Sequence, residues 1–270
     1  MYPTKWQTAI MATLRERGRC TITDLASELD VSDETIRRHV RALVEEGRLL
    51  RVHGAVALPL GQTEPPFSLR LKERTEAKRL IGRQAAAQVQ DGQTVMIDGG
   101  STTTFVAEAL LERKELSVVT NSLEIARILL GRQGHRVFLA GGEFRADIGA
   151  AVGTEALSFI EQFRADLAIL SIGAVSAEDG LMDFDLAEAR IAQAMIGACR
   201  RTIVVADAAK LGATARVRVC GFDEIDAIVS DAQIPPPMRP CIKSAALQWM
   251  VAGTWPAAGP AETAMTDAAD

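Results

Sequence analysis

Cysteine and histidine are scarce in this chain of 270 residues, which contains four of the first and three of the second. The cysteines are Cys20, Cys199, Cys220 and Cys241. They are far apart, form no Cys-x-x-Cys pair and have no histidines beside them at a zinc-binding spacing. We therefore expect reduced cysteines that pack in the interior, no disulfide framework, and neither a metal site nor a cofactor.

Long apolar segments are also absent. No run of 18 residues is both apolar and free of charge, and residues 1–6 lack the apolar core of a signal peptide. We expect a cytoplasmic protein with no membrane partner. With 21 glycines, 10 prolines, 48% hydrophobic and 24% charged residues, the chain is globular rather than collagen-like or disordered. Its length suits one large domain or two ordinary ones.

Positive charge is limited as well, since the net charge is −5. This balance excludes a polyanion binder coated with positive charge, but the charge is unevenly distributed. Residues 1–60 carry nine basic and eight acidic side chains, whereas the remainder is more acidic than basic. Between residues 35 and 55, five arginines accompany only two glutamates, so basic charge gathers in one short stretch.

The N-terminal part has helical periodicity followed by strand signals. Apolar spacing around Leu14 predicts a first helix, Thr23 is expected to cap a second, and Ser32 is expected to cap a third. Residues 48–58 predict two strands that meet at a glycine turn. This order of elements is typical of a winged helix-turn-helix.

The remaining chain predicts a linker and a second domain. Turn formers and the Pro65-Pro66 pair interrupt every periodicity, so we assign residues 1–58 to the winged helix and 59–74 to a linker. Strand-like apolar runs then alternate with helical stretches at 94–97, 116–119, 136–139, 166–170, 202–205 and 227–229. They predict an α/β domain over 75–252, with a largely parallel sheet covered on both faces. Residues 253–270, rich in Ala, Pro and Thr, are expected to be disordered.

Polar residues follow several of the predicted strands. They are Asp98, Gly99, Gly100, Ser101, Thr102, Thr103, Asn121, Glu143, Arg145, Asp207 and Lys210. Ligands of open α/β sheets bind beyond the carboxyl ends of the strands, so we expect these residues to form a ligand pocket. Taken singly, each is as typical of a turn or a surface ion pair, and only their shared placement favours a site.

The third predicted helix and the following strands carry side chains suited to DNA. They are Thr35, Arg37, Arg38, Arg41, Arg51 and His53. A helix that enters the major groove needs such side chains to contact bases and phosphates. A solvated helix face is the alternative, which the capped second helix, the short turn and the basic wing make less favourable.

Short sequence motifs in both predicted domains resemble those of one known family. Residues 31–40 and 47–55 resemble the DNA-binding signature of DeoR-family bacterial transcription regulators. Residues 98–103, 119–121, 140–145, 152–153 and 207–210 resemble, in order, the motifs of that family's sugar-phosphate sensor domain. Two further stretches, 159–166 and 180–185, resemble its glycerol-3-phosphate branch. The collinear order makes chance a poor explanation.

The resemblance implies a sensor domain with a fold like that of sugar-phosphate isomerases. It implies a DNA-binding repressor of a carbohydrate or glycerol catabolic operon. The implied partners are double-stranded operator DNA, a second or further copies in a homodimer or homotetramer, and a phosphorylated sugar or polyol, glycerol 3-phosphate first, that releases the DNA. The residues agree with this, because a glycine- and hydroxyl-rich loop before a helix favours an anion.

Two positions depart from the family's pattern. His39 stands where an acidic residue is usual, and Ala192 stands where many members have a lysine. Because isomerases use such a lysine together with carboxylates, Ala192 counts against catalysis, and we assign no catalytic residue. An isomerase-like enzyme with an accessory DNA-binding domain remains the alternative. A nucleotide-binding oxidoreductase is less favoured, since residues 98–101 do not form Gly-x-Gly-x-x-Gly.

Overall fold

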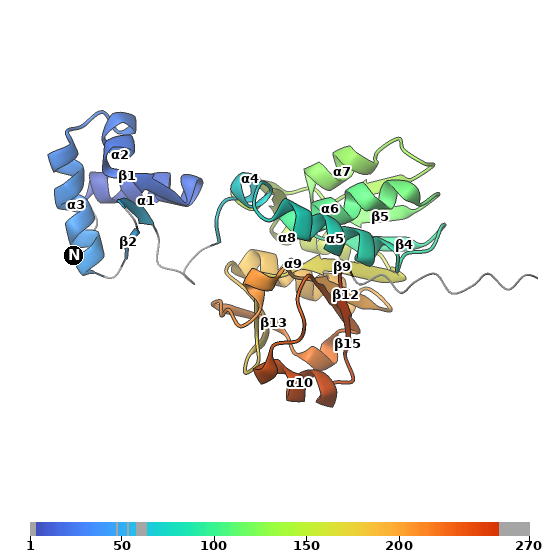
Figure 1. Ribbon diagram of the computed structural model, residues 1–270. Helices are drawn as coiled ribbons and strands as arrows, with labels where there is room; N and C mark the ends of the chain where they lie inside the picture. The colour runs from blue at the N-terminus through green and yellow to red at the C-terminus, as the bar shows by residue number, and fades with distance from the viewer. Residues whose placement is uncertain (1–3, 47, 53, 58–63, 254–270) are drawn as a thin grey trace, which may run out of the picture.

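The computed structural model describes residues 4–46, 48–52, 54–57 and 64–253, which form two domains (Figure 1). The N-terminal domain contains α1 (Lys5–Arg17), β1 (Arg19–Thr21), α2 (Ile22–Glu28), α3 (Asp33–Glu45), β2 (Leu50–Val52) and β3 (Ala55–Ala57). The strands form an antiparallel sheet in the order β1-β3-β2. The predicted winged helix-turn-helix is confirmed.

Local capping explains where the helices of this domain begin. The Ser32 side chain accepts a hydrogen bond from Thr35 N, as expected for the cap of α3. The cap of α2 is Thr21 and not the expected Thr23. Thr21 is the cap because Asp24, three residues later, completes a capping box: its backbone N–H donates to Thr21 Oγ1, and its carboxylate accepts from Thr21 N. The three-residue strand β1 before it was too short to predict from alternation.

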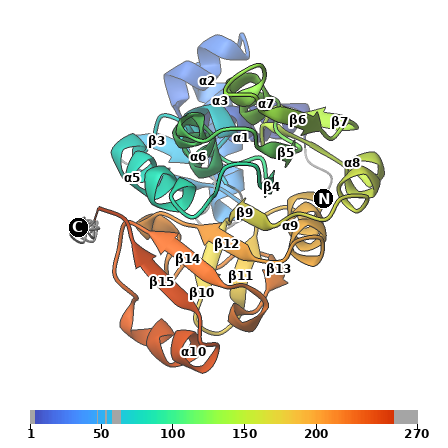
Figure 2. The ribbon, with the colours of Figure 1, turned by 90° about the vertical axis from the view of Figure 1, so that its right-hand side faces the viewer.

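The C-terminal domain is built on seven parallel strands in the order β15-β14-β12-β9-β4-β5-β6 (Figure 2). They are β4 (Thr94–Ile97), β5 (Ser117–Thr120), β6 (Arg136–Leu139), β9 (Leu167–Ser171), β12 (Thr202–Val205), β14 (Ala227–Ser230) and β15 (Gln248–Val251). The predicted parallel sheet is confirmed, and β15 at its edge is an addition.

Helices cover both faces of this sheet. Alternate residues of a strand point to opposite faces, so Val95 and Ile97 pack with one helical layer and Met96 with the other. The first layer contains α5 (Thr75–Ala86), α6 (Ser101–Ala109) and α7 (Leu123–Leu129), and the second contains α8 (Thr154–Ile160), α9 (Leu186–Gly197) and α10 (Arg239–Ser244). No helix among the described residues is long and apolar enough to cross a membrane.

Shorter elements complete the domain. They are the pair β7 (Glu143–Arg145) and β8 (Ala150–Val152), the sheet of β10 (Ala174–Ser176), β11 (Gly180–Asp183) and β13 (Val217–Cys220), and the 3-10 helices η1 (Leu110–Glu112), η2 (Ala208–Lys210), η3 (Phe222–Glu224) and η4 (Pro236–Met238). The strands β7 and β8 carry the chain from the β6 edge back toward the middle of the large sheet.

The order of the strands reverses at β4. From β4 the chain adds β5 and β6 on one side, and it then crosses to β9 on the other side. The loops after β4 and β9 therefore leave in opposite directions and open a crevice between them at the carboxyl ends. This crevice is where the fold places a ligand.

The segment expected to be a linker is partly structured. Its described part, from residue 64, contains α4 (Phe67–Arg70), and Phe67 N donates to Asp147 O at 2.8 Å. The Phe67 ring fills the space beside Gly149, where a Cβ would lie 2.6 Å from it. The proline pair breaks the sequence periodicity, but Pro66 is buried and precedes α4 directly. Residues 58–63 and the expected tail at 254–270 lie outside the described residues.

The helices α5 and α6 approach each other closely at Gly82. A Cβ there would lie 2.6 Å from Phe105 O, so any side chain forces the helices apart. We expect Gly82→Ala to lower the free energy of unfolding by about 1–3 kcal/mol, although alanine is the better helix former by about 1 kcal/mol. Gly197 in α9 is the matched control, because a Cβ there meets open space. Urea denaturation should show Gly197→Ala to be neutral or stabilising, and equal effects at both positions would contradict the close packing.

Candidate functional site

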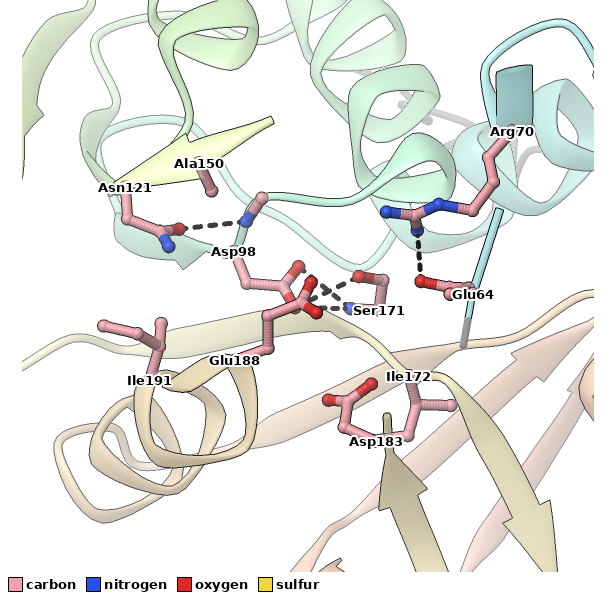
Figure 3. Close-up of a pocket in the computed structure, with 11 residues that line it drawn as sticks. Glu64, Arg70, Asp98, Asn121, Ala150, Ser171, Ile172, Asp183, Glu188 and Ile191 are labelled. Carbon is pink, nitrogen blue, oxygen red and sulfur yellow. Dashed lines mark hydrogen bonds and ion pairs between the residues drawn. The ribbon is translucent and has the colours of Figure 1, made fainter. Parts of the chain in front are cut away.

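A pocket of about 370 Å³, part of it open to solvent, lies at the crevice between β4 and β9 (Figure 3). Its lining comes from six separate stretches of chain and comprises Glu64, Arg70, Asp98, Gly99, Asn121, Ala150, Ser171, Ile172, Asp183, Glu188 and Ile191. Charged and polar side chains predominate.

One wall of the pocket is cationic. Arg70 lies on α4 with only 9% of its side chain exposed, and its Nη1 atom lies 2.7 Å from Glu64 Oε2. Lys210, at the end of η2, donates from Nζ to the other oxygen of the same carboxylate. Arg70 Nε is buried and has no hydrogen-bond partner among the described residues. Arg70 is therefore fixed by its ion pair with Glu64, and its Nε–H group can still donate a hydrogen bond to a ligand.

The opposite side of the pocket carries carboxyl groups that resist ionisation. Burial raises the pKa of Asp98 to about 7, although its oxygens accept hydrogen bonds from Ser171 N at 2.9 and 3.0 Å. Burial and the negative charge of Glu64 raise the pKa of Glu188 to about 8. Burial, followed by the charge of Glu188, raises the pKa of Asp183 well above its ordinary value. A protonated carboxyl both donates and accepts, which suits the hydroxyl groups of a sugar or polyol.

The loop from Asp98 to Thr103 lies at the start of α6, with Gly100 as the N-cap residue. Thr103 Oγ1 donates to the carbonyl oxygens of Asp98 and Gly100, so this hydroxyl holds the loop rather than facing a ligand. Gly100 is required by packing, since a Cβ would lie 2.0 Å from Ser171 Oγ. Asp98 and Gly99 line the pocket, whereas the expected Gly100, Ser101, Thr102 and Thr103 are not among its lining residues. The N–H groups of Ser101, Thr102 and Thr103, in the first turn of α6, have no acceptor within the helix.

Three other predicted residues lie at or near the pocket. Asn121 lines it while bracing two segments, because its Oδ1 accepts from Gly99 N and its Nδ2 donates to Ala151 O, both at 2.9 Å. Lys210 reaches the pocket through Glu64. Asp207 is buried, caps η2 and pairs with Arg74 at 3.1 Å.

Glu143 and Arg145 do not line the pocket. Glu143 is exposed on β7. Arg145 pairs with Asp147 at 2.6 Å and with Asp185 at 2.7 Å, and both partners raise its pKa. Asp185 caps α9, the helix that carries Glu188. Arg145 therefore helps to position this helix through its ion pair with Asp185, without contacting the pocket.

Several lining residues were not expected from the sequence. Glu64 and Arg70 fell within the predicted linker, and Asp183 and Glu188 lie on β11 and α9, outside the predicted strand ends. Ser171 directly follows the strand predicted over 166–170, and this position was the available signal. Ala192 lies one turn beyond Glu188 on α9 and is buried in the core, with 2% exposed.

The helix α3 presents a basic face to solvent. Ile36, Val40 and Leu43 are buried in the core of the N-terminal domain, whereas Arg37, Arg38 and Arg41 are exposed. The three arginines lie one helical turn or less apart and therefore share a face. Arg37 lies 3.8 Å from Asp33, and within the described residues Arg38 and Arg41 form no ion pair.

The other predicted DNA-binding residues differ in exposure. Thr35 is half-buried and its hydroxyl lies 3.0 Å from Ser32 Oγ, while Arg51 is exposed on β2. His53 lies outside the described residues. His39 is half-buried on α3, and burial together with the charge of Arg38 lowers its pKa, so it packs as a neutral ring.

Comparisons with known proteins cover both domains. Residues 7–60 match the model of the DeoR-like helix-turn-helix domain, and residues 73–232 match that of the DeoR C-terminal sensor domain. The chain is 37% identical to the glycerol-3-phosphate regulon repressor of Escherichia coli (strain K12), over 88% of this chain and 94% of that protein. It is 35% identical to the HTH-type transcriptional repressor CsqR of the same organism, over 84% and 87%.

Among solved structures, ribose 5-phosphate isomerase a from Methanocaldococcus jannaschii aligns with 52% of this chain and 55% of that one, at 14% identity and a TM-score of 0.39. A similarity of this size supports no functional argument.

The raised pKa of Asp98 predicts a pH dependence of stability. Between its unfolded value near pH 4 and about pH 7, the folded state binds the proton and the unfolded state does not, so stability falls as the pH rises. Relative to Asp98→Asn, the free energy of unfolding of the wild type should fall by about 2–3 kcal/mol between pH 5 and pH 8. Urea denaturation across this range measures it. Asp179→Asn, at an exposed carboxylate, is the control, and parallel profiles for wild type and Asp98→Asn would contradict the assignment.

Proposed function

The chain belongs to the DeoR family of helix-turn-helix transcription regulators, and we propose that it is a repressor released from operator DNA by a phosphorylated polyol. The observation that carries the proposal is the polarity of the pocket between β4 and β9. Cationic groups lie on one side, and carboxyl groups whose pKa values are raised by burial lie on the other. A ligand with an anion at one end and hydroxyl groups at the other fits this arrangement.

The phosphate end of the ligand is assigned to the cationic wall. Arg70 and Lys210 supply charge, and the unpartnered Nε of Arg70 supplies a donor in the guanidinium plane. The first turn of α6 adds N–H groups and the positive end of its dipole. Charge-assisted hydrogen bonds of this kind are the strong ones in proteins.

The polyol end is assigned to Asp98, Asp183 and Glu188. The pKa values of about 7 for Asp98 and about 8 for Glu188 keep a fraction of these two groups protonated near neutral pH, so that they both donate to and accept from hydroxyl groups. Burial raises the pKa of Asp183 in the same direction. The names of the relatives point to glycerol 3-phosphate as the first compound to test. The proposal therefore specifies a phosphorylated polyol, with glycerol 3-phosphate as the leading member of the class.

The DNA-binding surface is assigned to the basic face of α3 and to the wing formed by β2 and β3. One winged helix buries little surface, so we propose that two or more copies bind a repeated operator, with half-sites a whole number of helical turns apart. The effector binds more tightly to the conformation of the protein that cannot bind the operator, and so shifts the population toward that conformation. A coupling of about 1–3 kcal/mol gives a change of 5- to 150-fold in operator affinity.

An enzymatic role is not favoured. The relatives that match nearly the whole chain are named repressors, and the N-terminal match is a DNA-binding domain. Ala192 also replaces the lysine that the isomerase alternative would need, and its methyl group is packed in the core. The carboxyl groups of the pocket are therefore assigned to ligand binding.

Removal of one arginine from α3 tests the DNA interface. Arg38→Ala should weaken operator binding by about 1–3 kcal/mol if the guanidinium contacts a base, or lower the salt slope by about 1 if it contacts a phosphate. Fluorescence anisotropy with the DNA upstream of the protein's own gene, at several salt concentrations, measures both. Arg200→Ala, at a side chain 86% exposed on the sensor domain, is the control. Unchanged affinity of Arg38→Ala at every salt concentration would count against this docking.

Lys210→Ala tests the effector site. The loss of one charged donor should raise the ligand concentration needed to release DNA by about 10- to 100-fold, and should weaken operator binding without ligand far less. Lys243→Ala, at an exposed lysine of α10, is the control. Gel-shift titrations use glycerol 3-phosphate, fructose 1-phosphate, fructose 6-phosphate and unphosphorylated glycerol.

The panel separates the two parts of the proposal. If a different phosphorylated compound binds best, the effector is not glycerol 3-phosphate, but the proposal of a phosphate sensor still holds. If no phosphorylated compound acted, or if glycerol acted equally well, the phosphate sensor itself would be wrong.

A further inference from the structure

The cationic wall of the pocket already holds an anion that belongs to the chain itself. Glu64 places one carboxylate oxygen 2.7 Å from Arg70 Nη1 (Figure 3). Its other oxygen accepts a hydrogen bond from Lys210 Nζ. Its side chain is 12% exposed and lines the pocket. One carboxylate thus engages both of the cations that the phosphate of the effector would use.

This carboxylate is ionised where it lies. Burial opposes its ionisation, but Arg70 and Lys210 together outweigh burial and lower the pKa of Glu64. Its charge also extends across the pocket, since it raises the pKa of Glu188. A phosphate brought into the same space would face a negative charge at short range, so the two anions exclude each other.

Glu64 stands on the segment that joins the two domains. Glu64 lies seven positions after Ala57, the last residue of the wing strand β3, so the wing lies within about 25 Å of Glu64. On its other side the chain enters α4, where Leu69 contacts the N-terminal domain: a Cβ on Gly18 would lie 3.1 Å from Leu69 Cδ2. The segment from Glu64 to Arg70 therefore contacts the pocket and the DNA-binding domain together.

We propose that Glu64 is a tethered anion in the phosphate subsite, and that the effector must displace it, which releases the segment leading to the DNA-binding wing. This inference rests on the proposed function and adds its coupling step. A phosphate monoester carries nearly two charges at neutral pH and three acceptor oxygens, so it competes successfully with one carboxylate for the same donors. The apparent affinity for the effector is reduced by the fraction of molecules in which Glu64 occupies the subsite.

Glu64→Gln removes the competing charge but keeps the size of the side chain. Isothermal titration of the full-length protein with glycerol 3-phosphate and with inorganic phosphate should show about tenfold tighter binding than in the wild type, because the subsite is no longer occupied by an anion. Glu64→Asp keeps the charge on a side chain that is shorter by one methylene group. Its affinity for these ligands should lie between those of the wild type and Glu64→Gln. Glu76→Gln is the matched control, since Glu76 is 83% exposed on α5 and pairs only with Arg79 among the described residues.

Gel shifts on the same variants test the coupling. Without effector, Glu64→Gln should bind operator DNA at least fivefold more weakly than the wild type, and the effector should then cause little further release. Thermal unfolding of each variant establishes that it is folded, and Glu64→Asp carries the test if Glu64→Gln is not.

The outcomes separate this inference from the proposed function. If the wild type binds glycerol 3-phosphate and releases DNA, while both Glu64 variants bind it no more tightly, Glu64 is not a competitor and the inference fails alone. Weaker binding by Glu64→Gln would assign Glu64 to the ligand and also overturn the inference. If neither the wild type nor any variant binds a phosphorylated compound, the proposed function fails with it.

Discussion

The contact between Asp98 and Ser171 is the constraint on which the pocket depends. It joins the residue after β4 to the last residue of β9, the two strands between which the sheet changes direction. The carboxyl group accepts from both the backbone and the hydroxyl of Ser171, and Gly100 fits against the same serine. The position of α6 and its N-terminus follows from this contact. The carboxyl group of Asp98 thus joins the two strands from a buried position, and burial raises its pKa although the hydrogen bonds from Ser171 oppose that shift.

The fold was largely predictable because its signals are local. Buried parallel strands appear in the sequence as continuous apolar runs, and β4 and β12 were predicted with their observed bounds. The helix cap at Ser32 and the glycine turn of the wing are likewise set within a few residues. The edge strand β15 was missed because the polar, exposed Gln248 interrupts the apolar pattern, as an exposed edge permits.

The candidate site was predictable only in part, because its central interaction joins distant positions. Lys210 and Glu64 are separated by 146 residues, and nothing in the sequence around Glu64 distinguishes it from a linker carboxylate. Arg70 gave no signal either, since a single arginine after a proline pair is ordinary at a surface. Asp98 and Asn121 were predicted because each follows an apolar run. Ligands bind beyond the carboxyl ends of parallel strands, and this rule applies to a residue without knowledge of which other residues it contacts.

The charged and polar residues that line the pocket lie in loops, at the ends of strands and near the ends of helices, and none of them belongs to the hydrophobic core clusters. This separation has an evolutionary consequence. Lining positions outside the hydrophobic core, such as Glu64 and Arg70 on the segment before α5, can change, and so alter which ligand fits, without affecting the contact between β4 and β9. Duplicated copies of such a gene can therefore diverge in the nutrient they respond to while inheriting the same scaffold and the same DNA-reading helix. A regulator of this design is suited to expansion into large sets of paralogues within one genome.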